Sequence, residues 1–367
     1  MQDGNTVSRT AIGRSAQEMI TSPNALITGW DVGGAHLKLA QADAAGNIVA
    51  AVQIPCPLWQ GLDRLTSAIE AAGSEIVASP RHAVTMTGEL VDLFADRAEG
   101  VRRLIATLAA ALPDAALEIY AGRAGFLAPE AAVPRWQEVA SANWLASVRL
   151  AAARLPEGLF IDIGSTTTDV VPFRHGADLA LGLTDAERLA SDELVYTGIT
   201  RTPVMALADS VPFAGQWQGV MAEHFATLAD VYRLTGALPE GADQHPTADG
   251  RDKSPEASRR RLARMLGRDA EEASPAAWRA LATHLADRQR GRIAAAVARV
   301  QSRGLIGAEA PLVGAGIGRF VVRRLAEESG RPYEDFGALL GGQAEVREAA
   351  VCCAPAAAVA LLAMAEA

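Results

Sequence analysis

The sequence predicts an α/β protein built from two related halves. Two segments 131 residues apart (162 − 31) carry one pattern, in which an apolar run ends in an acid and a glycine: Trp30-Asp31-Val32-Gly33-Gly34 and Ile161-Asp162-Ile163-Gly164-Ser165. In a third segment, Pro311-Leu312-Val313 has the character of a short strand and runs into a glycine-rich loop and a helix. These three observations together predict strands and helices in both halves of the chain.

Each of the two repeated loops is expected to cap a β-hairpin. Strand-like residues flank the first loop at 25–30 and 37–40, and the second at 159–161 and 169–173. Glycines let backbone amides turn toward an anion, and an acid at a strand end can hold a hydrated divalent cation beside phosphates. The pattern therefore predicts a duplicated phosphate-binding loop. Plain tight turns, with threonines present for strand propensity, are the alternative.

The glycine-rich loop of the third segment opens a helix. Gly314-Ala315-Gly316-Ile317-Gly318 precedes a helix that we expect from Arg319 to Glu328. Such a loop presents unpaired amides and the positive end of the helix dipole to an anion or a nucleoside. Its spacing is G-x-G-x-G, not the G-x-G-x-x-G of dinucleotide folds. A nicotinamide site is therefore not expected.

Length and composition favour a two-domain enzyme of the cytoplasm. The chain has 367 residues, of which 50% are hydrophobic, enough to fill two cores. The net charge of −9 argues against nucleic acid or an anionic membrane as the main partner. The three cysteines include no C-x-x-C pair, the histidines show no metal-ligand spacing, and no apolar run approaches the ~18 residues of a membrane span. We expect a reducing compartment and no structural zinc.

Hydrophobic periodicity and turn residues predict the remaining elements. The polar N-terminal residues 1–24 are typical of a loose tail. Up to residue 155 we expect, in order, a helix at 62–72, a strand at 83–86, a helix at 100–111, a strand at 116–120 and a helix at 139–154. Beyond it we expect an irregular segment at 194–204, a helix from 224 to 234, an exposed loop at 239–256, arginines of 259–268 on a solvated helix face, and helices at 285–300 and 356–364.

The three loops, in this order and spacing, resemble those of the actin-like ATPase superfamily, which includes sugar kinases, Hsp70 and the hydantoinase/oxoprolinase group. The resemblance covers almost the whole chain. It implies a two-domain α/β fold of the ribonuclease H type, with mixed five-stranded sheets and a ligand held in a central cleft. The implied domains are residues 25–155, residues 156–345 with a helical insertion, and a C-terminal helix at 346–367 that packs back on the first domain.

Further stretches are similar to one branch of this superfamily. They are Thr85–Leu90 with Asp96–Val101, Ser141–Ala146, Asp162–Asp169, Tyr196–Gly198 with Arg201–Val204, and Ala229–Gly236. They resemble the tetrahydromethanopterin-linked one-carbon pathway proteins, a branch similar to the methanofuran (methylofuran) synthases. The resemblance implies a transferase that joins an aminomethyl-furanmethyl diphosphate to the phenol of a γ-glutamyl-tyramine or tyrosine acceptor and releases diphosphate. His36 stands where an asparagine is expected in this branch.

Loop chemistry and the resemblance together assign candidate roles. Phosphate binding is assigned to Gly33, Gly34, Gly164, Ser165, Thr166, Thr167, Gly314 and Gly316. Asp31 and Asp162 would hold Mg²⁺ through water. Lys38 would meet the charge of the leaving group. Because the chain has 32 arginines and only two lysines, a lysine in this hairpin indicates that a compact ammonium is wanted there, with a solvent-facing lysine as the alternative.

Three further residues are candidates for substrate chemistry. Glu89 is the candidate base for the phenol, and capping of a helix that begins at Leu90 is its alternative role. Asn143 and Arg201 are candidate substrate contacts, each with a purely structural alternative. The expected partners are a small-molecule diphosphate and a phenolic acceptor.

Two other functions remain open at this point. The first is an ATP-dependent kinase or an oxoprolinase-like hydrolase, in which the same loops bind ATP and Gly314–Gly316 faces the adenosine, although the oxoprolinase group normally has far longer chains. The second is a nonenzymatic, nucleotide-switched module like the chaperone and cytoskeletal members. The sequence shows no long interaction segment of the kind such a module would use.

Overall fold

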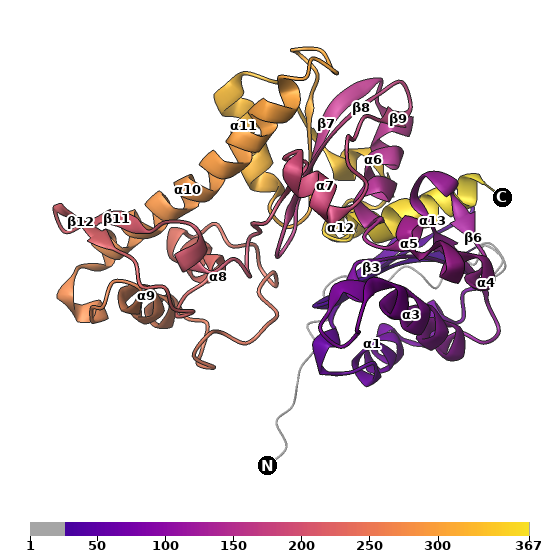
Figure 1. Ribbon diagram of the computed structural model, residues 1–367, viewed down its shortest axis with the longest axis horizontal. Coiled ribbons are helices and arrows are strands. Elements are labelled where there is room, and N and C mark those ends of the chain that lie inside the picture. Colours follow the sequence, from indigo (N-terminus) through magenta and orange to yellow (C-terminus); the bar gives the residue numbers. More distant parts are fainter. Residues whose placement is uncertain (1–25, 367) are drawn as a thin grey trace. The chain divides into compact units, whose positions relative to one another are not determined.

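The computed structural model describes residues 26–366, which form two compact units (Figure 1). Unit 1 comprises the described residues up to Pro156, then Phe173–Asp178 and everything from Asp335 onward. Unit 2 comprises Glu157–Pro172 and Leu179–Glu334. The chain thus returns to unit 1 at Asp335 and not at 346, because a short strand beyond it joins the sheet of unit 1. The expected tail at 1–24 lies outside the described residues.

Unit 1 is built on a mixed sheet with the strand order β15-β3-β2-β1-β4-β5-β6. Its strands are β1 (Ile27–Val32), β2 (His36–Ala42), β3 (Asn47–Pro55), β4 (Arg81–Met86), β5 (Ala116–Tyr120), β6 (Phe126–Leu127) and β15 (Gly341–Gly342). β1 pairs antiparallel with β2 and parallel with β4. Five long strands therefore form the expected five-stranded sheet, and two-residue strands extend it to seven at its edges.

Helices cover both faces of this sheet (Figure 1). Apolar residues of α1 (Asp63–Ala72) and α3 (Arg97–Ala111) join those of β1, β2 and β4 in one buried core. On the other face, α13 (Ala354–Ala365) contacts the same three strands and α6 (Asn143–Arg154). The short helices of this unit are α2 (Ser74–Val77), α4 (Pro129–Ala132), α5 (Trp136–Val139) and α12 (Ala344–Val351). The C-terminal helix is thus part of unit 1.

One helix of unit 1 differs from its prediction. The helix expected at 139–154 is broken, because α5 ends at Val139 and α6 begins at Asn143. Ser141 between them has φ 52°, a left-handed conformation that no continuous α-helix contains. The helix predictions at 62–72 and 100–111 and the strand predictions at 83–86 and 116–120 are confirmed, with starts shifted by up to three residues.

The second sheet repeats the arrangement of the first. Its strand order is β10-β8-β7-β13-β14, with β9 pairing with β8 off this path. The strands are β7 (Glu157–Ile163), β8 (Thr168–Arg174), β9 (Ala177–Asp178), β10 (Leu194–Val195), β13 (Leu312–Ala315) and β14 (Tyr333–Asp335). β13 lies parallel to β7, as β4 lies parallel to β1. The predicted duplication is therefore confirmed at the level of strand order, and α11 (Arg319–Ser329) follows β13 as expected.

Unit 2 also contains a mainly helical part (Figure 1). Its elements are β11 (Ser210–Phe213), β12 (Gln216–Gly219), α8 (Leu228–Thr235), α9 (Pro255–Arg264) and α10 (Pro275–Gln301), whereas α7 (Asp185–Ala190) contacts β10 of the second sheet. α10 is longer than the predicted 285–300 and packs against α8 and β11. α8 begins later than the expected residue 224, because Thr227 and Asp230 form a capping box at its start.

The sequence predicted that the arginines of α9 face solvent. The structure shows that one of them does not. The Arg261 side chain is fully buried and donates to Asp230 Oδ1 at 2.7 Å and to Asp249 Oδ1 at 3.1 Å. A buried guanidinium needs such partners, since an unpaired charge is costly to desolvate. Arg260, by contrast, is exposed as expected.

No single helix within residues 26–366 is long and apolar enough to cross a membrane; α12 and α13 reach that length and composition only when taken together, and the chain bends by 111° between them.

Candidate functional site

The first loop, residues 33–36, is a tight turn that hydrogen bonds to the segment at Leu58. The Gly33 amide donates to the His36 carbonyl at 3.0 Å, which closes the turn between β1 and β2. The Gly34 carbonyl accepts from the Leu58 amide at 3.0 Å. This hydrogen bond ties the loop to the segment that follows β3 in unit 1.

An acid and a lysine face each other next to this loop. Asp31 and Lys38 are direct partners in the β1–β2 register, with 3.6 Å between Lys38 Nζ and Asp31 Oδ2. The Asp31 side chain is 3% exposed and that of Lys38 is 23% exposed. Lys38 is therefore a counter-charge to a buried carboxylate. The alternative of a lysine that simply faces solvent is excluded.

A buried thiol lies close to this pair. Burial raises the pKa of Cys353 to about 12, while the charge of Lys38 acts to lower it and the charge of Asp31 acts to raise it. The thiol is therefore protonated near neutral pH and is a weak nucleophile. Cys353 is buried directly before α13, whereas Cys352 is only half-buried.

The second loop, residues 164–167, makes the same turn in unit 2. The Gly164 amide donates to the Thr167 carbonyl at 3.0 Å. The Gly164 carbonyl accepts from the Ile199 amide at 3.0 Å, and the Ser165 carbonyl accepts from the Arg201 amide at 2.9 Å. Residues 198–201 thus hold the loop carbonyls on one side. The serine and threonines of the loop are half-buried, and Ser165 Oγ lies 3.4 Å from Thr166 Oγ1.

Two features of the segment 198–201 bear directly on the second loop. A Cβ atom at Gly198 would lie 2.5 Å from the Ser165 carbonyl carbon and 2.6 Å from its oxygen, so only glycine fits. Arg201 Nη1 donates to Thr166 Oγ1 at 3.3 Å. The structure therefore brings the candidate substrate residue Arg201 onto the predicted phosphate loop. This puts a guanidinium, which suits phosphate, next to the loop hydroxyls.

The acid of the second hairpin adjoins the start of α11. The Gly318 amide donates to the Ile163 carbonyl at 2.9 Å, directly after Asp162. Gly316 has φ 76°, and a Cβ atom there would overlap Asp162 Oδ1 and lie 2.5 Å from the Ile163 carbonyl oxygen. Unit 2 therefore gathers a strand-end carboxylate, a hydroxyl-lined loop and a helix N-terminus around one point, which is an arrangement suited to an anion and a cation together.

Gly314 lies elsewhere than predicted. The residue belongs to β13, where it pairs with Ile161 of β7, and is not part of the glycine loop. A side chain there would collide with the Tyr333 ring, 2.8 Å from the position of a Cβ atom. Gly314 therefore makes room for the half-buried ring of Tyr333, and the loop that precedes α11 is shorter than expected.

Glu89 and Asn143 are engaged in the architecture of unit 1. Glu89 is 1% exposed and accepts a hydrogen bond from Ser141 Oγ at 2.8 Å. It lies within the turn Gly88–Leu90 and caps no helix. Asn143 Oδ1 accepts from the Trp144 amide at 2.8 Å, at the first residue of α6. A base that meets an incoming phenol must be accessible, so the burial of Glu89 favours a structural role.

The two hairpins differ in one chemical respect that the sequence did not reveal. Counted from the turn, Asp169 occupies the place in β8 that Lys38 occupies in β2. Asp169 Oδ1 accepts from Arg188 Nη2 at 2.7 Å, and the Arg188 side chain is 2% exposed. The same nitrogen donates to the Glu193 carbonyl at 3.0 Å. The second hairpin is therefore neutralised by an arginine of α7, which no local spacing indicates.

The described residues offer limited support for a resident metal. Among residues 26–366, no three or more His, Cys, Asp or Glu side chains are grouped to hold an ion. Mg²⁺ commonly uses one or two carboxylates together with water and substrate phosphates. Asp162 fits that mode, because it is half-buried beside the loop hydroxyls. Asp31 is already balanced by Lys38.

The paired sheets, each with a β-hairpin and a parallel third strand, define an actin-like ATPase fold. The chain is similar to the nucleotide-free structure of an acetone carboxylase, with a TM-score of 0.51 and 10% identity over 84% of this chain and 68% of that one. The family model for hydantoinase/oxoprolinase matches residues 81–363. The chain belongs to this family.

Two curated relatives carry one name, "(4-{4-[2-(gamma-L-glutamylamino)ethyl]phenoxymethyl}furan-2-yl)methanamine synthase". The protein from Methanocaldococcus jannaschii is 31% identical over 247 residues, which cover 67% of this chain and 73% of the relative. The protein from Methanococcus vannielii is 33% identical over 116 residues, which cover 32% of this chain and 52% of the relative.

Proposed function

We propose that this protein is a transferase that forms a furanylmethyl–phenol ether in methanofuran or methylofuran biosynthesis. The observation that carries the proposal is the 31% identity over 247 residues to a furan-methanamine synthase. The name of that relative describes a product in which a phenol oxygen joins a methyl carbon of a furan. The phenol carries a γ-glutamylaminoethyl group and the furan carries an aminomethyl group. Such a product implies two small-molecule substrates, one that provides the phenol and one that provides the furan.

The reaction that suits the loops is displacement of diphosphate. The bond between the furanylmethyl carbon and the diphosphate oxygen breaks, and the phenol oxygen forms a new bond to that carbon. The phenol gives up its proton, and diphosphate leaves with the electron pair of the broken bond. The electron-rich furan stabilises positive charge on the methyl carbon. The protein therefore needs mainly to bind the departing anion and to place the phenol.

Unit 2 supplies the groups for the anion. We assign the diphosphate to the second loop, where the hydroxyls of Ser165, Thr166 and Thr167 lie together with the guanidinium of Arg201. The N-terminus of α11, which follows Gly316 and Gly318, adds the favourable end of a helix dipole. Mg²⁺, if bound by Asp162 through water, would supply further neutralisation of the phosphate oxygens.

Lys38 of unit 1 is a separate candidate, which comes from the sequence. Its ammonium is held near Asp31 at 3.6 Å and is 23% exposed, so it keeps donors for a ligand. The resemblance makes it the candidate for the negative charge that grows on a leaving group. Such an interaction is stronger in the transition state than in the ground state and therefore acts on kcat. Gly33 and Gly34 are assigned to phosphate contacts of the first loop.

The test is release of diphosphate from an aminomethyl-furanmethyl diphosphate in the presence of γ-L-glutamyl-tyramine or L-tyrosine. Asp162→Ala should abolish turnover and leave the unfolding transition nearly unchanged, because a half-buried acid at a loop contributes little to packing. The exposed Asp209, at the start of the β11–β12 hairpin, gives the matched control Asp209→Ala, which should turn over like the wild type.

Two results would contradict the proposal. Near-normal turnover of Asp162→Ala would mean that the second loop is a plain turn. A wild-type protein that ignores the furanylmethyl diphosphate but hydrolyses ATP, or transfers its phosphate, would favour the kinase or hydrolase alternative.

A further inference from the structure

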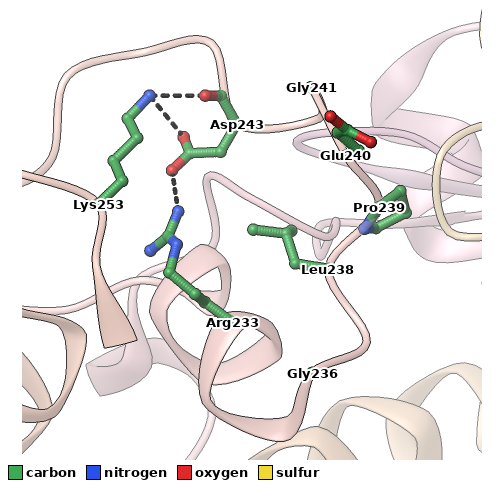
Figure 2. Close-up of a pocket in the computed structure, with 8 residues that line it drawn as sticks. All are labelled: Arg233, Gly236, Leu238, Pro239, Glu240, Gly241, Asp243 and Lys253. Atoms are coloured by element: carbon green, nitrogen blue, oxygen red, sulfur yellow. Dashed lines mark hydrogen bonds and ion pairs between the residues drawn. The ribbon is translucent and has the colours of Figure 1, made fainter. Parts of the chain in front are cut away.

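A pocket of about 320 Å³ lies in the helical part of unit 2, and its lining includes no residue of the second loop (Figure 2). Its wall is formed by the end of α8 and by the loop that follows it up to Lys253. Arg233 and Lys253 supply two cations, Asp243 and Glu240 supply two carboxylates, and Leu238 supplies apolar surface. The pocket therefore presents both signs of charge to one small volume.

Asp243 sits between the two cations and orders them. Its Oδ2 lies 2.5 Å from Arg233 Nη2, and its Oδ1 lies 3.6 Å from Lys253 Nζ (Figure 2). Lys253 Nζ also donates to the Asp243 carbonyl at 2.6 Å. An ammonium carries three protons. The Lys253 side chain is 36% exposed, so it retains a donor that can meet a ligand carboxylate.

The base of the pocket is a buried ion network. Arg233 Nη1 donates to Ser258 Oγ at 2.9 Å and lies 3.3 Å from Asp230 Oδ1. Asp230 in turn accepts from the fully buried Arg261 at 2.7 Å. A network in which each charge is paired holds its members in one geometry, which is how a binding site is preorganised. Arg233 is therefore fixed before any ligand arrives.

Two observations connect this pocket with the proposed reaction. Its α8 wall falls in Ala229–Gly236, one of the stretches that resemble the one-carbon branch. The loop of Asp243 also reaches the neighbourhood of the second loop: the pKa of His245 is lowered first by burial and then by the charge of Arg201, the residue that donates to Thr166.

We propose that this pocket binds the α-amino-acid head of the phenolic acceptor, with its carboxylate on Lys253 and Arg233 and its ammonium on Glu240. The inference rests on the proposed function, because it names the part of the acceptor that distinguishes it from a simple phenol. γ-L-Glutamyl-tyramine and L-tyrosine both carry such a head, and tyramine does not. A zwitterion matches a lining of two cations and two carboxylates, whereas a phosphate would face Glu240 and Asp243 unfavourably.

The experiment is calorimetric titration of the full chain with γ-L-glutamyl-tyramine, with L-tyrosine and with tyramine. Lys253→Gln and Glu240→Gln should each weaken binding of the amino-acid acceptor about tenfold or more, as expected for loss of one charge-assisted contact. Arg251→Gln and Glu256→Gln remove the same charges from exposed side chains that do not line the pocket, and should bind like the wild type. Unfolding curves for all four variants show whether they are folded.

Tyramine, which lacks the amino-acid head, should bind most weakly. Whichever of γ-L-glutamyl-tyramine and L-tyrosine binds more tightly is the acceptor whose head group the pocket fits. Equal affinity for tyramine, or unchanged affinity in both Lys253→Gln and Glu240→Gln, overturns the inference. Binding needs no diphosphate substrate, so the two proposals fail separately. A wild type that binds the acceptor in this pocket but never releases diphosphate contradicts the transferase alone. A wild type that turns over while Lys253→Gln keeps its affinity contradicts the pocket alone.

Discussion

Lys38 combines two duties at the scale of a single residue. Its ammonium balances Asp31, which is 3% exposed, and it is assigned to the leaving-group charge. Removing it leaves a buried carboxylate without that counter-charge, which costs roughly 1–3 kcal/mol of stability. A fall in activity after substitution could then come from either duty. The two duties can be separated by also replacing Asp31 with a neutral residue, because the buried carboxylate that needs the counter-charge is then removed.

We predict that Lys38→Ala lowers kcat about 10²-fold, as for loss of one oxyanion-type donor, and raises KM much less. Lys38→Arg should restore activity only in part, because a planar fork on a longer stem does not reproduce a compact charge. The double variant Asp31→Asn/Lys38→Met should recover stability in urea unfolding while kcat stays low. A kcat like that of the wild type in Lys38→Ala would place the leaving group elsewhere.

His82 gives the stability of unit 1 a pH dependence. Its Nδ1 accepts from Trp30 Nε1 at 2.9 Å, and both side chains are fully buried. Burial lowers the pKa of His82 from 6.5, against the opposing effect of the Val77 and Ser79 carbonyls. Between the lowered pKa and 6.5 the unfolded chain binds more protons, so stability rises with pH there. The contribution is complete above pH 6.5 and is lost as the pH falls through the folded pKa.

The expected result is that the free energy of unfolding in urea falls between pH 7.5 and pH 5 more steeply in the wild type than in His82→Gln. Glutamine can still accept from Trp30 but carries no proton equilibrium. The exposed His224 provides the control, since His224→Gln should keep the slope of the wild type. Identical slopes in the wild type and His82→Gln would mean that the imidazole titrates alike in both states.

At the scale of elements, the second loop depends on the backbone that packs against it. Three amides of residues 199–201 donate to loop carbonyls, and Gly198 leaves no room for a Cβ atom. The loop hydroxyls are therefore positioned by a segment more than 30 residues further along the chain. Substitutions in this segment should therefore change the affinity for diphosphate, even where the substituted residue, such as Gly198, does not contact the ligand.

We predict that Gly198→Ala weakens Mg²⁺–diphosphate binding by about 10²-fold, because a displacement of the loop by about 1 Å is enough to disturb such a site. Isothermal titration measures this directly. Gly219→Ala in β12 is the matched control: a Cβ atom there meets nothing within 4 Å, so binding should not change. Unchanged binding in Gly198→Ala would show that the loop does not hold the anion.

For the whole molecule, a ligand that binds only the folded state raises the melting temperature by mass action. Mg²⁺ with inorganic diphosphate at about 100 times its Kd should add about 2.7 kcal/mol to the stability of the part that binds it. We expect a rise of several degrees in a thermal melt, absent in Asp162→Ala. A chain stabilised by ATP but indifferent to diphosphate would support the kinase or hydrolase alternative.

Much of the architecture could be predicted from the sequence by itself. The repeated acid–glycine pattern predicted both hairpins, the glycine loop predicted α11, and local periodicity predicted most of the helices and strands. These succeed because hairpin turns and helix starts are decided by residues adjacent in the chain. The pattern also led to Asp31, Lys38 and Asp162, since each stands at a fixed distance from its turn.

Contacts between distant segments were decided only by the tertiary structure. Nothing near Glu89 in the chain shows that Ser141 reaches it, and nothing near Asp169 shows that the buried partner is Arg188. Arg261 is likewise buried only because α9 packs against α8, although the sequence predicted a solvated face for it. The pocket beside Lys253 forms only because the loop after α8 folds back on the end of that helix. The physical reason is that pairing of buried charges depends on where the backbone brings segments together, whereas turn and helix signals are local.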